Sequence, residues 1–150
     1  YLDLDATLSL NIAEQLSYKY TGDTQVSKDD FENYVQFCTK TEELEIPKST
    51  CALFARKMAA LGSDTKEGSF AYFKEVFDFL LSSNGAGLAT YKAFEVSQKI
   101  MTPKPQAVKN FITSYKYGIS KNGLNFDKAK TLNFAYKMSG QSNRLPASKK

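Results

Sequence analysis

Residues 111–138 read FITSYKYGISKNGLNFDKAKTLNFAYKM, and they match residues 31–58, FENYVQFCTKTEELEIPKSTCALFARKM, without a gap. The aligned pairs that are identical are Phe31/Phe111, Leu44/Leu124, Lys48/Lys128, Phe54/Phe134, Ala55/Ala135, Lys57/Lys137 and Met58/Met138. A less exact copy, from Phe73 to Met101, lies between them, with Leu88 in the place of Leu44 and Leu124. A unit that recurs every ~35–45 residues predicts a stacked array, which presents a binding surface.

Each copy has the pattern of two helices joined by a short turn. Apolar residues recur at helical spacing on both sides of a polar or Asn-Gly turn. Before the first copy, an apolar stripe predicts one more helix, formed by Leu8, Ile12, Leu16 and Tyr20. No segment shows the sustained alternation of a half-buried strand. We therefore predict an all-α fold of about seven helices, with an N-terminal helix followed by three repeated antiparallel helical hairpins. They would form a right-handed α-α superhelix or a compact helical bundle.

The expected helices can be placed along the chain. They span about 6–20, 27–40, 47–61, 64–81, 90–101, 106–119 and 126–138. Ser27 with Asp30, and Asp64 with Glu67, have the spacing of helix N-terminal caps. The helix before residue 81 is aromatic on most sides, which predicts burial at the centre of the fold. We expect residues 1–140 to form a single all-α domain and residues 141–150 to form a flexible basic tail.

The two cysteines lie at equal distances from the middle of the first turn. Because residues equidistant from the turn of an antiparallel hairpin lie at the same height, Cys38 and Cys51 mark a close crossing of two helices. Gly118 and Thr131 take the matching positions in the last copy. The cysteines either fill the crossing as small apolar side chains or form a disulfide. A disulfide would place the protein in an oxidising compartment, secreted or periplasmic, whereas the compartment is otherwise undetermined.

Charge is distributed as a gradient. Residues 1–50 carry 10 acidic and 4 basic side chains, whereas residues 101–150 carry 1 acidic and 10 basic ones. In the C-terminal third, rings and positive charges interleave at Tyr115, Lys116, Tyr117, Lys121, Lys128, Lys130, Tyr136 and Lys137. This set is the candidate partner-binding surface. Aromatic rings among lysines suit an acidic protein surface or RNA, and they also occur on ordinary amphipathic helices.

Composition argues against catalysis. The chain has no histidine, which removes the commonest general base and metal ligand at neutral pH. Three loops resemble the calcium loops of EF-hand proteins, around Asp23, Asn84 and Asn122, but they lack the required carboxylates. No apolar run is long enough to span a membrane. We therefore expect no catalytic residues, no metal site and no cofactor.

Three functions remain open. The favoured one is a non-enzymatic helical-repeat module that binds another protein through its aromatic and lysine-lined surface. The first alternative is RNA binding through the basic C-terminal third. The second is a degenerate EF-hand-like or apolar-ligand-binding bundle, with a pocket lined by Phe70, Phe73, Phe77 and Leu81. The repeat units also resemble tetratricopeptide and pentatricopeptide hairpins, without the Trp-Leu-Gly-Tyr signature of the former.

Overall fold

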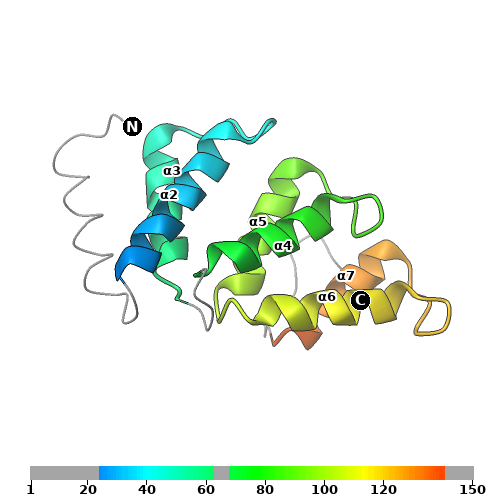
Figure 1. The fold of residues 1–150 in the computed structure, drawn as a ribbon. Helices are drawn as coiled ribbons and strands as arrows, with labels where there is room; N and C mark the ends of the chain where they lie inside the picture. Colours follow the sequence, from blue (N-terminus) through cyan, green and yellow to red (C-terminus); the bar gives the residue numbers. More distant parts are fainter. Residues whose placement is uncertain (1–23, 63–67, 141–150) are drawn as a thin grey trace. The chain divides into compact units, whose positions relative to one another are not determined.

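The computed structural model describes residues 24–62 and 68–140, and these are helical with short connections (Figure 1). The helices are α2 (Thr24–Lys40), α3 (Lys48–Ala59), α4 (Phe70–Leu81), α5 (Thr90–Met101), α6 (Ala107–Ile119) and α7 (Lys128–Met138). The described ranges contain no strand, so the all-α prediction and the helical hairpins are confirmed. The expected helix over 6–20 and the expected basic tail over 141–150 lie outside the described residues.

The chain divides into two compact units, Tyr1–Ala71 and Tyr72–Lys150. In the first unit α2 and α3 lie side by side (Figure 1). Cys38, Cys51, Ala52 and Ala55 are fully buried there, together with the larger Tyr34 and Met58. The single domain over residues 1–140 stays a prediction.

Helix α4 begins later than its sequence suggests, and its cap comes from elsewhere in the chain. The sequence predicts a start near Asp64, but the helix begins at Phe70. The described part of α2 is already helical from Thr24, so Ser27 and Asp30 do not form its N-terminal cap. The Asp30 carboxylate instead accepts hydrogen bonds from the backbone N–H groups of Ser69 and Phe70, which begin α4. A helix leaves its first N–H groups without intrahelical partners, and Asp30 supplies two of them with an acceptor.

The second unit contains two turns that are built alike. In the α4–α5 turn, Phe79 O accepts from Ala86 N, Leu80 O from Leu88 N, and Ser82 O from the N–H groups of Gly85 and Gly87. In the α6–α7 turn, every one of these bonds recurs 38 positions later, at Tyr117/Leu124, Gly118/Phe126, Ser120/Gly123 and Ser120/Asn125. The serine side chains repeat too, since Ser82 Oγ accepts from Asn84 N and Ser120 Oγ from Asn122 N. The two hairpins therefore have the same local architecture.

This hydrogen-bond pattern corrects the register of the middle copy. The sequence alignment pairs Leu88 with Leu124, but the turns pair Ala86 with Leu124 and Leu88 with Phe126. Glycine is required at Gly85 and Gly123, because a Cβ there would collide with the carbonyl oxygen of Phe79 or Tyr117. The Asn-Gly pair therefore carries the register, whereas the leucines do not.

The corrected register explains why the hairpins differ in width. Cα atoms of α6 and α7 approach within 8 Å repeatedly, as do those of α2 and α3, whereas those of α4 and α5 seldom do. Gly118 faces Thr131 in the last hairpin, and the equivalent positions of the middle hairpin hold Leu80 and Ala93. A buried leucine requires more room than glycine. The ring of Phe73 meets that of Phe94 between α4 and α5, with centroids 6.4 Å apart.

Candidate functional site

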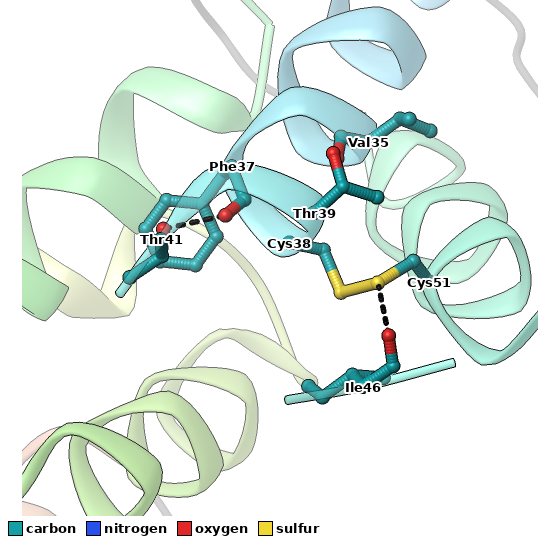
Figure 2. Close-up of a disulfide and its surroundings, with 7 residues drawn as sticks. All are labelled: Val35, Phe37, Cys38, Thr39, Thr41, Ile46 and Cys51. Atoms are coloured by element: carbon teal, nitrogen blue, oxygen red, sulfur yellow. Dashed lines mark hydrogen bonds between the residues drawn. A yellow bond between two sulfur atoms is a disulfide. The ribbon is translucent and has the colours of Figure 1, made fainter. Parts of the chain in front are cut away.

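Cys38 and Cys51 form a disulfide that joins α2 to the first turn of α3 (Figure 2). Their Cα atoms are 5.7 Å apart, within the ~7 Å that a disulfide can span. The structure therefore shows the disulfide rather than two free thiols. Figure 2 also shows Ile46 beside the bond, with its carbonyl oxygen 3.8 Å from Cys51 Sγ. Because a disulfide sulfur carries no proton, this approach is a contact and not a hydrogen bond.

Asp30, Ser69 and Tyr34 form a buried polar cluster at the start of α4. Ser69 Oγ is 3.0 Å from the Asp30 carboxylate, 2.8 Å from the Met58 carbonyl and 2.9 Å from the Tyr34 hydroxyl. Asp30, Ser69 and Tyr34 are all almost completely buried. The Ser69 hydroxyl has a single proton, so it donates to Asp30 or to Met58 but not to both. Tyr34 donates its own proton to Ser69 whenever Ser69 donates elsewhere.

Burial dominates the electrostatics of this cluster. It raises the pKa of the Asp30 carboxyl above its ordinary value, and the hydrogen bonds from Ser69 and Phe70 oppose this only in part. Burial also raises the pKa of Tyr34 well above its ordinary value, with the hydrogen bond to Ser69 acting in the opposite direction. Gly68 is required beside the carboxylate, because a Cβ there would lie 2.5 Å from Asp30 Oδ2. The cluster is closed to solvent and holds the start of α4.

Two of the eight residues proposed for the partner-binding surface are buried. Tyr115 packs its ring edge-on against Phe79, with centroids 5.2 Å apart, and it also contacts Phe111. Tyr136 is buried in α7. Burial raises the pKa of both phenols, and the Tyr115 hydroxyl has no hydrogen-bond partner within the described part of the chain. These two tyrosines belong to the core because they lie on the helix faces that point inward.

The other six residues of that set are exposed. Tyr117 leaves 54% of its surface in solvent. The five exposed lysines are Lys116, Lys121, Lys128, Lys130 and Lys137. Lys128 Nζ donates to the Ser83 carbonyl at 3.4 Å, and Lys130 Nζ lies 4.6 Å from the centroid of the Phe126 ring. Over residues 104–137 there are 7 lysines and 1 acidic residue, Asp127, whose carboxylate caps α7 by accepting from Lys130 N. The exposed part of this region is therefore positively charged.

Two exposed apolar side chains in the same unit were missed from the sequence. Leu124 is 36% exposed and Met138 is 56% exposed. Both belong to the identical pairs of the sequence alignment, Leu44/Leu124 and Met58/Met138, and that identity does not indicate whether a side chain is exposed. The turn register pairs Leu124 with Ala86 and Met138 with Ile100. Because both counterparts are buried, the register does not predict that Leu124 and Met138 are exposed.

The described residues hold no group of three or more His, Cys, Asp and Glu side chains that could bind a metal ion. None of the described helices is long and apolar enough to cross a membrane. Of the four side chains expected to line an apolar pocket, Phe73 and Phe77 are buried, whereas Leu81 is exposed. These four residues therefore do not share one buried lining.

Comparison of the chain with protein-family models, with curated proteins and with solved structures finds no match.

Proposed function

We propose that this chain is a helical-repeat module that binds another protein, through the exposed face formed by Tyr117 and its neighbouring lysines. The observation that carries the proposal is an exposed aromatic ring in a region of strong positive charge. Tyr117 is 54% exposed, and residues 104–137 hold 7 lysines against a single acidic residue. Exposed tyrosines are frequent anchors of protein interfaces, because they bury a large area and lose little conformational freedom. Lysines around the ring favour a partner of opposite charge.

Purification from the native source, followed by mass spectrometry, tests the proposal. A bait carrying Lys116→Glu, Lys121→Glu and Lys128→Glu should lose a partner that the unaltered chain retains. The matched control reverses three exposed lysines of the first unit, Lys28, Lys40 and Lys48. We expect the control to retain the partner. Equal loss from both triple variants, or no stoichiometric partner on any bait, would contradict the proposal.

RNA binding is the second candidate, favoured by the same excess of lysines. A protein that neutralises several phosphates shows an affinity that falls steeply with salt concentration. An electrophoretic shift assay with single-stranded RNA, at 50 and 200 mM salt, measures this dependence. The triple reversal in α6–α7 should then reduce both the affinity and the salt slope. Absence of binding at low salt removes this candidate.

The disulfide supports a place in an oxidising compartment, outside the cell or in a periplasm. Disulfides persist in such compartments and are reduced in most cytosols. Alkylation of the native chain with iodoacetamide, directly on harvest and without reductant, tests this. We expect no label on Cys38 or Cys51 before reduction and two labels after it. Labelling before reduction would contradict the assignment.

A further inference from the structure

The second unit has one hairpin whose outer side is covered and an equivalent hairpin whose outer side is exposed. The turns of α4–α5 and α6–α7 share four backbone hydrogen bonds at the same spacing, so each residue of one hairpin has a defined counterpart in the other. Ala86 is 6% exposed, and its counterpart Leu124 is 36% exposed. Ile100 is 0% exposed, and its counterpart Met138 is 56% exposed. Equivalent positions of the two hairpins therefore differ in exposure, although the turns are built alike.

In the middle hairpin, α6 packs against Phe79. Phe79 lies against two rings of α6, those of Phe111 and Tyr115, with centroids 6.5 and 5.2 Å away. Both rings meet Phe79 edge-on, at 87° and 83°. Phe111 and Tyr115 are four residues apart, so they lie on one face of α6. A helix with two aromatic side chains at this spacing is therefore the shape that this position accepts.

Tyr117 is the counterpart of Phe79, and it is 54% exposed. Together with Leu124 and Met138 it defines what we call the end face. Leu124 adjoins Tyr117, since its N–H donates to the Tyr117 carbonyl, and Met138 lies at the other end of α7. Three large apolar side chains are thus exposed at positions that the preceding hairpin keeps covered or half-covered.

The positive charge near the end face favours one kind of binding partner over others. The lysines next to the end face in sequence, Lys116, Lys121 and Lys128, are exposed. Residues 141–150 carry Arg144, Lys149 and Lys150 and no acidic residue, so they do not supply the acidic side chains that a lysine-lined face favours. The middle hairpin is covered by a helix with lysines, Lys109 and Lys116, but an occupant of the more basic end face should carry acidic residues instead.

We propose that the end face binds an amphipathic helix of another protein, which presents two apolar or aromatic side chains four residues apart with acidic residues beside them. Such a helix repeats at Tyr117 the packing that α6 provides at Phe79, with its side chains at i and i+4 as the anchors. The inference rests on the proposed protein-binding function and names the class of partner.

The test uses a peptide with the sequence of residues 107–119, changed by Lys109→Glu and Lys116→Glu and labelled for fluorescence anisotropy. The full chain should bind it saturably. Tyr117→Ala should weaken binding roughly tenfold, the size expected for loss of an interface anchor. The matched control is Tyr91→Ala, since Tyr91 is 55% exposed on α5 and should leave the affinity unchanged. A second peptide with Phe111→Ala and Tyr115→Ala should not bind.

Several results would overturn the inference. They are the absence of saturable binding, equal weakening by Tyr91→Ala, and binding of the alanine peptide as tightly as the aromatic one. Sedimentation velocity adds another: self-association that Tyr117→Ala abolishes would make a second copy the occupant. If a native partner copurifies equally with the unaltered chain and with Tyr117→Ala, the protein-binding function survives and the end-face inference fails.

Discussion

Asp30 shows how a single carboxylate can serve a helix to which it does not belong. It lies in α2, and its two oxygens accept from the N–H groups of Ser69 and Phe70, at 2.7 and 3.1 Å. The partners are 39 and 40 residues away in sequence. The positive end of the α4 dipole also attracts the negatively charged Asp30 carboxylate. The same contact fills space so closely that only glycine fits at Gly68.

Replacement of Asp30 by asparagine should lower the free energy of unfolding by about 1–3 kcal/mol. Asparagine has one acceptor oxygen, so its NH₂ group would face a backbone N–H donor in a buried place. Urea titration followed by circular dichroism measures the loss. Glu95→Gln makes the same chemical change at an exposed position of α5, and it should stay within about 0.5 kcal/mol of the unaltered chain. Equal effects of the two substitutions would show that Asp30 is not a structural cap.

The free energy of unfolding should depend on pH through the ionisation of Asp30. Its pKa in the folded protein is raised above the ordinary value of 3.8, so between these two values the folded state binds more protons than the unfolded state. The carboxyl therefore stabilises the fold most below pH 3.8, and this contribution is lost as pH rises through the raised pKa. In urea titrations across this range, the stability gap between the unaltered chain and Asp30→Asn should narrow as pH increases. A gap that widens with pH would contradict this sign.

The sequence could not assign this role to Asp30. Its spacing from Ser27 predicts a cap at the start of its own helix, and that interpretation is wrong because α2 is already helical from Thr24. Capping rules consider residues three positions apart, whereas these contacts join Asp30 to residues 39 and 40 positions away. The cysteine pair is different, because its equal distance from the turn predicts proximity, and the disulfide is present.

At the scale of helices, the residue at one crossing sets the width of each hairpin. Gly118 lies against the side chain of Thr131, and a Cβ added at Gly118 would be 2.9 Å from Thr131 Cγ2. The middle hairpin holds Leu80 and Ala93 at the same two positions, and its helices lie farther apart. The first hairpin uses the two cysteines there. The three hairpins thus have three different residue pairs at the same helix crossing.

Gly118→Leu should destabilise the chain by about 1–3 kcal/mol, because it overfills a closely packed crossing. Adding Thr131→Ala recreates the Leu80/Ala93 pair and should recover part of the loss. A double-mutant cycle, measured by urea denaturation, gives the coupling between the two sites, expected at about 0.5–3 kcal/mol. Lys116→Leu places the same side chain at an exposed position of α6 and serves as the control. Strictly additive effects would contradict the assigned register.

The helical pattern could be predicted because apolar spacing and turn residues are local signals. The predicted bounds of α5, 90–101, agree with the structure, and those of α6 and α7 differ by one or two residues. The predicted register of the middle copy is wrong, because leucine occurs in all three copies, whereas the Asn-Gly pair that carries the register occurs in only two of them. Burial of Tyr115 and Tyr136 was also missed, since the ring-and-charge pattern does not show which way a helix faces.

At the scale of the whole molecule, the disulfide lies in one of two compact units. It joins residues 13 positions apart, both within Tyr1–Ala71. A crosslink that closes a loop of about this size restricts the unfolded chain and is worth about 3 kcal/mol. How far that stabilisation reaches depends on whether the chain unfolds as one cooperative domain, as the sequence predicts for residues 1–140, or unit by unit.

Reduction of the disulfide should therefore act unequally along the chain. We expect amide hydrogen exchange in α2 and α3 to accelerate by about two orders of magnitude, which corresponds to about 3 kcal/mol. Exchange in α6 and α7 should change little, because their buried contacts with each other and with Phe79 lie within the second unit. Exchange measured by mass spectrometry on the full chain, with and without reductant, resolves the helices. Cys38→Ala with Cys51→Ala serves as a control free of reductant effects. Equal acceleration in all helices would show that the two units unfold together, and the single domain predicted from the sequence would then be the better description.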